Sequence, residues 1–391
     1  MLETDVLVVG GGPAGSTAAR FLALSGFDVL LVERNFAYRK PCGGAIPSAS
    51  LSEFDVPPEE VRRKIGKILL VSPRGTRLEI DLSGDYLCIT ERGSFDEAMR
   101  KMARIAGAKL LEAEFTGFES VGPTTVSVVK KKDGDELTRI VSRYVIAADG
   151  INGKVSSALR LPKPDFLYTI SAPVTGEADC SGAPSEQRKL YRDDVCEFWF
   201  GSRHAHNFYS WLFPSVGYAM AGTGGARPRD LPALFSAFLR RRQREEGYSS
   251  ECLHLGSKRC AFRVPSWNGR PFSSGNVLFV GDAAGLVMPV TYEGIYYAMK
   301  SGQLAAQAIS ENTPALYPQL WNGKLGGRFA IMTKIRSHLF RSDERIEKWI
   351  ALHRHQEVQE MAIRLWLKKE TGLGVLASYA ASFRHLLPDL L

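Results

Sequence analysis

Short apolar runs, each ending in a glycine or an acidic residue, alternate with helical patterns along this chain. Strand-like runs cover residues 5–9, 28–32, 144–148 and 276–280, and helix-like stretches cover residues 16–23, 231–239 and 293–307. Short buried strands that alternate with helices predict an α/β fold. Because no apolar run reaches 18 residues, the pattern predicts no membrane-spanning helix.

Residues 209–214 show a period of two, in which aromatic residues alternate with Ser210 and Leu212. This period places Tyr209, Trp211 and Phe213 on one face of a strand. Such an aromatic face is either part of a sheet core or the wall of a site for an apolar ligand.

The first strand leads into a glycine-rich turn and then a helix. The turn is Gly10-Gly11-Gly12-Pro13-Ala14-Gly15, and the second strand ends at Glu33. Gly10 permits the tight turn, Gly12 lets the backbone approach a pyrophosphate, and Gly15 lets the helix pack closely on the strand. The helix N-terminus offers free N–H groups to phosphate, and the acid at the end of the second strand suits a ribose. The pattern predicts dinucleotide binding but does not by itself distinguish FAD from NAD.

Two acidic residues follow later strands, Asp149 before Gly150 and Asp282 after Gly281. An aspartate in this position can accept hydrogen bonds from the hydroxyls of a ribitol chain, although each alone is equally typical of a turn or helix cap. Three motifs in this order favour FAD. The segment 222–226 has the wrong glycine spacing for a second dinucleotide motif, so no separate NAD(P) domain is predicted.

The order of these motifs resembles the p-hydroxybenzoate-hydroxylase-type FAD fold, and within that class the chain resembles the geranylgeranyl reductase family over nearly its whole length. The resemblance rests on Lys40-Pro41-Cys42-Gly43-Gly44-Ala45-Ile46-Pro47, Arg92 with Phe95-Asp96, Tyr209-Ser210-Trp211-Leu212-Phe213-Pro214, Gly281-Asp282-Ala283-Ala284-Gly285 and Glu293-Gly294-Ile295-Tyr296-Tyr297-Ala298-Met299. The chain is most similar to the branch that acts on the geranylgeranyl tail of (bacterio)chlorophyll or on the free diphosphate. That branch also carries a stretch similar to residues 341–345.

The resemblance implies a catalytic segment of Cys42, Gly43 and Gly44 over the flavin. Saturation of an isolated alkene needs a hydride from reduced flavin at one carbon and a proton at the other. Cys42 would hold the alkene, order a water or donate that proton. The alternative is that Cys42 is a small buried apolar residue, as many cysteines are.

The resemblance also implies the remaining site residues. Those expected to bind the cofactor are Gly10, Gly12, Pro13, Ala14, Gly15, Glu33, Arg34, Cys42, Gly43, Arg92, Asp149, Gly281, Asp282, Gly294 and Ile295. Those expected to bind substrate are Tyr209, Trp211, Phe213, Pro214 and Tyr292. Arg92 would contact the phosphate or adenosine part of the cofactor, or else be a surface arginine. Tyr292 departs from the family, which commonly has a small residue there, and its ring would crowd a helix N-terminus near the flavin.

Proteins of this class interleave their domains. We expect a discontinuous Rossmann-like FAD-binding domain at 1–60, 91–165 and 266–320, an antiparallel-sheet substrate domain at 61–90 and 166–265, and C-terminal helices at 321–391. Residues 328–369 carry apolar residues at helical spacing among basic ones. Such helices either lie in a membrane interface or cap the FAD-binding domain.

The net charge and the cysteines indicate which ligands and which cellular compartment suit this protein. The chain has 50 Lys and Arg against 42 Asp and Glu, a net charge of +8. This suits phosphorylated ligands or an anionic membrane surface, and no nucleic-acid-binding motif is present. The six cysteines (42, 88, 180, 196, 252 and 260) form no CxxC pair. We therefore expect reduced thiols, no metal site, and a cytoplasmic enzyme that is peripheral on the inner face of the membrane at most.

Three further interpretations concern partners and single segments. The electron donor would be NADPH or reduced ferredoxin, and the substrate a prenylated small molecule or lipid. His204 and His206 are interpreted as loop residues, and the basic run 240–244 as an exposed helix face. The alternatives are a reductase of another polyprenyl chain (a menaquinone tail or an archaeal-type lipid), a flavin monooxygenase or halogenase, and an electron carrier.

Overall fold

The structure is a computed structural model that describes residues 1–132, 134, 136–175, 177–178, 188–189, 191–246, 254–255, 259–269, 272–370, 374, 377–378 and 381. The chain forms two compact units. Unit 1 consists of residues 1–40, 93–166 and 264–330, and unit 2 of residues 41–92, 167–263 and 331–391. Both contain β-sheet and helices, as the α/β prediction requires.

The two compact units interleave along the chain. Their boundaries differ from the domain boundaries that the sequence predicted. Residues 41–60 and 331–391 group with unit 2. The boundaries of the functional domains stay a prediction, because a compact unit and a binding domain need not coincide.

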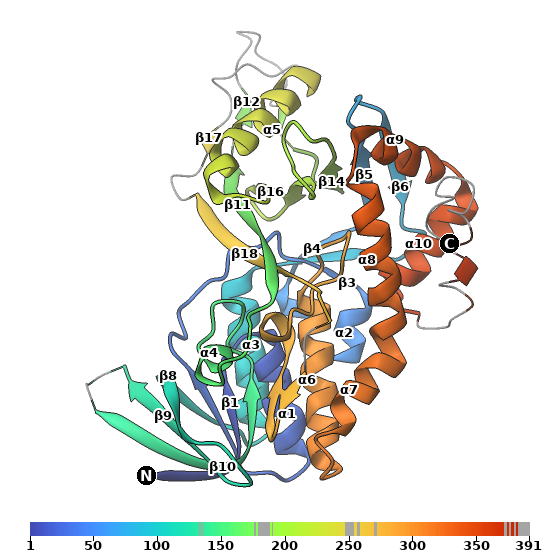
Figure 1. Cartoon of the computed structure of the whole chain (residues 1–391). Helices are drawn as coiled ribbons and strands as arrows, with labels where there is room; N and C mark the ends of the chain where they lie inside the picture. The colour runs from blue at the N-terminus through green and yellow to red at the C-terminus, as the bar shows by residue number, and fades with distance from the viewer. Residues whose placement is uncertain are drawn as a thin grey trace. The chain divides into compact units, whose positions relative to one another are not determined.

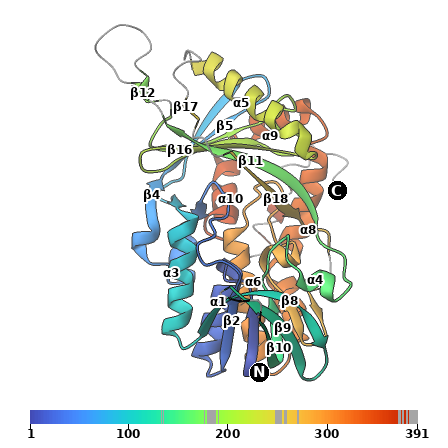
Figure 2. The ribbon, with the colours of Figure 1, turned by 90° about the vertical axis from the view of Figure 1, so that its left-hand side faces the viewer.

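The sheet of unit 1 has seven strands: β1 (Leu2–Val9), β2 (Val29–Glu33), β8 (Lys109–Ser120), β9 (Thr125–Lys131), β10 (Leu137–Ala147), β19 (Ser273–Ser274) and β20 (Val277–Phe279). β1 pairs in parallel with β2 and with β10, and β10 pairs in parallel with β20. The first residues of β8 continue this parallel layer, whereas its later residues pair antiparallel with β9. Figure 2 shows β8, β9 and β10 side by side. The parallel strands are buried and apolar, as their sequence predicted.

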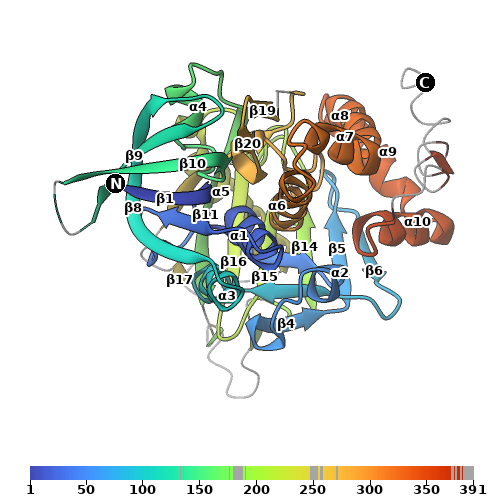
Figure 3. The same cartoon turned by 90° about the horizontal axis from the view of Figure 1, so that it is seen from below.

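Helices cover this sheet. Those of unit 1 are α1 (Pro13–Leu24), α3 (Arg92–Ile105, all but its first residue), α4 (Val155–Ala158), α6 (Ile295–Ser310) and α7 (Leu316–Trp321), with shorter turns at Gly281–Ala284 and Asn322–Gly326. α1 and α6 lie side by side (Figures 1 and 3). Their backbones approach closely at Gly302, where a Cβ would lie 2.3 Å from the carbonyl oxygen of Ala14.

Unit 2 is built on a larger sheet. Its strands are β5 (Lys67–Val71), β6 (Arg77–Asp81), β11 (Asp165–Thr175), β14 (Val195–Trp199), β15 (Ser210–Pro214), β16 (Ala219–Gly225), β17 (His254–Leu255) and β18 (Cys260–Ser266). The order is β17-β11-β16-β15-β14-β5-β6, with β18 beside β11. β14 and β5 pair in parallel, whereas β11, β16, β15 and β14 follow one another antiparallel. The sheet is therefore mixed, with a mainly antiparallel centre.

Smaller elements complete unit 2. A second sheet combines β3 (Ala45–Pro47), β7 (Leu87–Thr90) and β4 (Val61–Ile65), and the pair β12 (Glu177–Ala178) and β13 (Arg188–Lys189) stands apart. The helices are α2 (Ala49–Glu53), α5 (Leu231–Glu246), the end of α8 (Gly327–Leu339), α9 (Asp343–Leu352) and α10 (Gln356–Trp366), with single turns at Pro58–Glu60 and Pro228–Asp230. The structure describes too few residues beyond 370 to test the predicted C-terminal region there.

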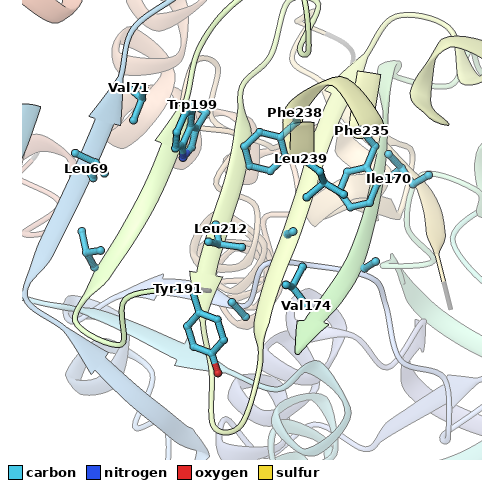
Figure 4. Packing of buried hydrophobic residues seen from close by; sticks show 14 of the residues in the cluster. Leu69, Val71, Ile170, Val174, Tyr191, Trp199, Leu212, Phe235, Phe238 and Leu239 are labelled. Carbon is cyan, nitrogen blue, oxygen red and sulfur yellow. The ribbon is translucent and has the colours of Figure 1, made fainter. Parts of the chain in front are cut away.

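One face of the unit 2 sheet packs against α5. Phe235, Phe238 and Leu239 of this helix meet Leu212 and Trp199 of the strands (Figure 4). Leu212 thus lies on the α5 side, and the neighbouring aromatic residues of β15 lie on the opposite face. The period of two predicted for this strand is confirmed.

The predicted exposure of the basic run 240–244 is wrong for Arg242. Its Nη2 donates to Glu197 Oε1 at 3.0 Å and its Nε to Glu197 Oε2 at 3.1 Å, with both side chains almost fully buried. Trp199 Nε1 donates to the same carboxylate at 2.8 Å. The charge pattern of a helix gives no sign of such a pair, because the partner lies on a distant strand.

The C-terminal helices α9 and α10 make contacts within unit 2. Trp366 of α10 contacts Phe198 with ring centroids 5.9 Å apart, and Trp349 of α9 contacts Phe200 at 5.5 Å. Asp343, at the start of α9, accepts hydrogen bonds from the backbone and hydroxyl of Ser202. α9 and α10 therefore pack on unit 2, and capping of the FAD-binding part stays a prediction. Peripheral membrane contact stays a prediction, and no helix in the described ranges is long and apolar enough to span a bilayer.

The thiols whose structure is described are unpaired: Cys42, Cys88, Cys196 and Cys260 are free. This confirms the expectation of reduced thiols for these four. Cys180 and Cys252 lie outside the described residues.

The buried ion pair is open to a direct test of stability. Arg242→Met leaves Glu197 buried without its cation, so we expect the free energy of unfolding to fall by about 3–5 kcal/mol. Arg244→Met, on the exposed side of the same helix, is the matched control and is expected to change it by less than ~0.5 kcal/mol. Urea denaturation measures both, and equal effects would contradict a special role for Arg242.

Candidate functional site

The glycine turn of unit 1 has three glycines with different roles. Gly10 has a φ of +110°, and a Cβ there would lie 2.2 Å from the carbonyl oxygen of Ala148. A Cβ on Gly15 would lie 1.9 Å from the carbonyl oxygen of Gly10. A Cβ on Gly12, by contrast, would meet nothing within 4 Å. Gly10 and Gly15 are therefore required by packing, whereas Gly12 faces space that a ligand can enter.

The N-terminus of α1 follows this turn. Gly12 is its N-cap, Pro13 occupies the first position, and no side chain caps the free N–H groups. Uncapped amides at the positive end of a 12-residue helix suit a diphosphate. The residues present therefore fit the diphosphate of a dinucleotide.

Glu33 ends β2 beside the turn. Its Oε2 accepts a hydrogen bond from the Gly11 N–H at 2.8 Å, and its Oε1 accepts one from the Asn35 N–H at 3.1 Å. The carboxylate thus fixes the turn and keeps lone pairs available for ribose hydroxyls. The next residue, Arg34, is exposed and lies over the ring of Tyr38 at 5.8 Å.

Asp149 follows β10, as predicted. Its Oδ2 accepts a hydrogen bond from the Val155 N–H at 2.9 Å, and a Cβ on Gly153 would lie about 2 Å from the carboxylate. Burial raises the pKa of Asp149 to about 6, partly opposed by these backbone hydrogen bonds. The turn role considered in the sequence is therefore present, and it does not exclude contact with a ligand.

Asp282 lies in the turn after β20. Lys40 donates to its Oδ2, and its Oδ1 lies 3.9 Å from where a Cβ on Gly294 would be. Gly294 is the N-cap of α6, which begins at Ile295 and has no side-chain cap. Gly281 has a φ of +57° and contacts the start of α1, since its Cβ would lie 2.9 Å from Ala14 Cβ. The structure thus brings the first and third predicted motifs, the glycine turn and the Asp282 turn, into contact within unit 1.

The loop before α6 has strained backbone. Val290 has a φ of +75° and Tyr292 a φ of +51°, in the left-handed region that favours glycine. Such strain costs on the order of 1–3 kcal/mol per residue.

Unit 2 holds the Cys-Gly-Gly segment. Gly44 has a φ of +75°, and its carbonyl oxygen accepts hydrogen bonds from the backbone and hydroxyl of Thr90, both at 2.9 Å. Cys42 is half-buried, and its Sγ accepts from the Gly44 N–H at 3.3 Å. A Cβ on Gly43 would lie 2.6 Å from the Phe213 ring and 3.3 Å from Trp211 Nε1. Two glycines thus let the thiol segment lie directly against the aromatic strand.

The aromatic face of β15 is buried and continues onto β14. Phe198 contacts Tyr209 with ring centroids 5.2 Å apart and Phe213 at 5.1 Å. Trp211 Nε1 is buried and has no hydrogen-bond partner in the described part of the chain. Pro214 ends the strand. Tyr209, Trp211, Phe213 and the Cys-Gly-Gly segment are therefore brought together in unit 2, whereas Tyr292 belongs to unit 1.

Some site features differ from the sequence-based interpretation. Arg92 opens α3 and is buried, with 8% of its surface exposed, so the surface alternative is wrong. His204 lies in a loop as predicted, yet it is buried, and its Nδ1 lies 2.8 Å from Ser210 Oγ. Burial and the neighbouring Arg241 lower the pKa of His204 to about 3. Within the described residues, no cluster of three or more potential ligands could hold a metal ion.

Arg100 and Phe198 were not predicted as site residues. Arg100 contacts the glycine turn from α3, and Phe198 extends the aromatic face from β14. Neither position carries a motif, so spacing along the chain gives no signal for them.

Comparison with known proteins decides the family. The FAD binding domain family matches residues 3–312. Geranylgeranyl diphosphate reductase of Rhodobacter capsulatus is 30% identical over 98% of this chain and 97% of its own length. The chain belongs to the geranylgeranyl reductase family of FAD-binding oxidoreductases.

A second relative supports this assignment, and a solved structure supports the fold. Digeranylgeranylglycerophospholipid reductase 2 of Methanothermobacter thermautotrophicus is 30% identical over the full length of both chains. A geranylgeranyl bacteriochlorophyll reductase-like protein of Thermoplasma acidophilum shares the fold, with a TM-score of 0.80, 22% identity and full coverage of both chains. The predicted fold class is confirmed: an α/β fold of the FAD-binding hydroxylase type with mixed sheets and C-terminal helices.

Because the space at Gly12 is open, a substitution there can test FAD binding without affecting folding. We expect Gly12→Val to fold normally, because its side chain meets nothing in the protein, yet to lose FAD because it fills the space for the diphosphate. Gly15→Ala is the contrasting variant, since its Cβ would collide with the Gly10 carbonyl and lower stability itself. Flavin absorbance after gel filtration and thermal unfolding measure the two effects. Retention of FAD by folded Gly12→Val would contradict this placement.

The buried Asp149 gives the FAD-free protein a pH-dependent stability. Because its pKa in the folded protein is about 6 against an ordinary 3.8, the folded protein retains a proton that the unfolded chain has lost between these values. The free energy of unfolding therefore falls as the pH rises from 3.8 to about 6, by up to ~3 kcal/mol from this group. Asp149→Asn is expected to remove that part of the slope. An unchanged slope in urea denaturation at several pH values would count against the assignment.

Proposed function

We propose that this protein saturates C=C bonds of a geranylgeranyl chain, using FAD as its redox cofactor. The observation that carries the proposal is the packing of the Cys-Gly-Gly segment on the buried aromatic strand of unit 2. A polyprenyl chain is long and apolar, so it needs such a wall beside the group that handles the proton. Two relatives, a geranylgeranyl diphosphate reductase and a digeranylgeranylglycerophospholipid reductase, support this substrate class.

Different residues of the chain are proposed to bind different parts of FAD. The uncapped start of α1, with Gly12, would hold the diphosphate, and Glu33 the ribose, while Asp149 and Asp282 would accept hydrogen bonds from the ribitol hydroxyls. Bound reduced FAD supplies the hydride. Arg92, buried at the start of α3, is proposed to contact the phosphate or adenosine part.

Cys42 is the proposed residue at the reacting bond. Its Sγ is held by the Gly44 N–H, which fixes the thiol on the Gly44 side of the segment. From there it is proposed to deliver a proton to one alkene carbon, directly or through a water. The buried indole N–H of Trp211, which lies against Gly43, is available to hold such a water, because a buried donor without a partner is costly.

The shape of the prenyl site is proposed to depend on two parts of the chain. Tyr209, Trp211 and Phe213 are proposed to form the apolar wall in unit 2, with Pro214 at the end of the strand. Tyr292, from the strained loop before α6, replaces the small residue common in the family and is proposed to restrict the space near the flavin. NADPH or reduced ferredoxin would supply electrons. A membrane-dissolved prenyl lipid and the positive net charge support contact with an anionic membrane surface.

A comparison of four prenyl compounds as substrates can identify the headgroup. The anaerobic, chemically reduced enzyme would be given geranylgeranyl diphosphate, a geranylgeranylated chlorophyll pigment, a digeranylgeranyl phospholipid and a menaquinone. Mass spectrometry is expected to show the stepwise gain of two hydrogens per double bond on one of the geranylgeranyl compounds. Reduction of menaquinone alone would replace the geranylgeranyl proposal by another polyprenyl substrate, and turnover only with oxygen would indicate a monooxygenase.

Replacement of Cys42 separates the chemistry from cofactor binding. Cys42→Ala is expected to bind FAD normally and to lose most of the rate of alkene reduction, roughly 100-fold or more, because a proton-transfer group contributes on this scale. Cys260→Ala, a free cysteine on β18, is the matched control and should keep the full rate. Single-turnover product formation measures both. Full activity of Cys42→Ala would contradict the proposed role.

A further inference from the structure

Arg100 of α3 places a positive charge behind the glycine turn. Its side chain is buried, with 7% of its surface exposed. Its Nη1 donates to the Gly11 carbonyl oxygen at 3.2 Å and its Nη2 to the Phe36 carbonyl oxygen at 2.9 Å. Its Cζ lies 5.3 Å from the centre of the Phe36 ring. Across the described part of the chain, no carboxylate forms an ion pair with this guanidinium.

A buried cation without an anionic partner is costly, so proteins rarely keep one. Glu33 reaches the same turn, but its carboxylate accepts from the N–H groups of Gly11 and Asn35. The opposite charge that Arg100 needs is therefore expected from a ligand.

The contact at Gly11 shows how Arg100 acts on that ligand. The carbonyl of Gly11 belongs to the same planar peptide as the N–H of Gly12, and in a trans peptide the two point in opposite directions. Ser16 Oγ also donates to the Gly11 oxygen, at 3.1 Å. Two donors on this oxygen fix the peptide plane, so that the Gly12 N–H points away from Arg100. Hydrogen bonds to the oxygen also polarise the N–H and strengthen it as a donor.

The space in front of Gly12 agrees with this direction. A Cβ on Gly12 would meet nothing within 4 Å, and the uncapped start of α1 lies next to it. A diphosphate there would accept a hydrogen bond from the polarised Gly12 N–H and lie at the positive end of α1. Arg100 would stabilise it indirectly, through the Gly11–Gly12 peptide.

We propose that Arg100 is a positioning residue for the diphosphate of FAD. With Ser16 it holds the Gly11–Gly12 peptide in its donor orientation, and the two negative charges of the diphosphate offset its buried charge. The proposal rests on FAD binding and not on prenyl reduction, so its failure leaves the proposed reaction untouched.

The test compares two arginines of the same helix. Arg100→Met is expected to weaken FAD binding about 10- to 100-fold, the effect of losing one charge-assisted hydrogen bond. Arg104→Met, exposed and one turn further along α3, is expected to leave FAD binding unchanged. Titration of the FAD-free protein, followed by the quenching of flavin fluorescence, measures both dissociation constants. Equal losses in the two variants would overturn the proposal, because they would reflect net charge alone.

A second readout separates positioning from packing. ADP, which keeps the diphosphate, should lose affinity for Arg100→Met by a factor similar to FAD, whereas adenosine should not. Arg100→Lys keeps the charge without the two-pronged geometry and is expected to lose less FAD affinity than Arg100→Met. If Arg100→Met or Arg100→Lys lowers the stability of the FAD-free protein but binds FAD and ADP with unchanged affinity, Arg100 only packs the turn and the proposal is wrong.

Discussion

Unit 1, which carries the proposed FAD site, depends on one constraint, the direct contact of backbones around the start of α1. Three glycines allow it: Gly10 against Ala148, Gly15 against Gly10, and Gly302 of α6 against Ala14. A side chain at any of these positions would overlap a carbonyl oxygen. Because α1 is held so close to β10 and α6, its uncapped N-terminus has a fixed place beside the strand ends that carry Glu33 and Asp149. The proposed cofactor site is thus formed by the packing of the unit itself.

In unit 2, glycines likewise allow a close approach, but to aromatic rings and not to backbone. A Cβ on Gly222 would lie 2.1 Å from the Trp211 ring, and a Cβ on Gly43 would lie 2.6 Å from the Phe213 ring. Glycines on two separate segments therefore leave room for the rings. On the opposite face of the sheet, the buried pair Glu197–Arg242 and the apolar cluster under α5 attach this helix to the strands. The aromatic face can accordingly serve a ligand, since the other face supplies the stability.

Much of this could be predicted from the sequence, because the residues concerned act through their neighbours along the chain. The glycine turn, the strand ends at Asp149 and Asp282, and the alternation at Trp211 all have local signatures, and the structure has the elements where they were predicted. Gly44 also follows a local rule, since glycine readily takes its positive φ, whereas Tyr292 takes a positive φ that its residue type disfavours. Family resemblance added the substrate class, which no local pattern carries.

What could not be predicted depends on contacts between distant segments. Arg100 approaches Gly11 across 89 positions of sequence, and Arg242 meets Glu197 across 45. The basic run that contains Arg242 has the composition of an exposed helix face, and only the fold shows that one of its members is buried. The packing of Trp349 and Trp366 on unit 2 is of the same kind, since amphipathic helices do not reveal from their own sequence which surface they cover.

The central claim is that electrons from the reduced flavin enter a C=C bond of a prenyl chain. The most direct measurement is to mix anaerobic reduced enzyme with one equivalent of geranylgeranyl diphosphate or geranylgeranyl lipid, and to follow flavin absorbance and product mass together. The account predicts that flavin reoxidation without oxygen coincides with the gain of two hydrogens by the prenyl chain. Flavin that stays reduced with every prenyl compound until oxygen is admitted, with substrate that then gains oxygen, would contradict it.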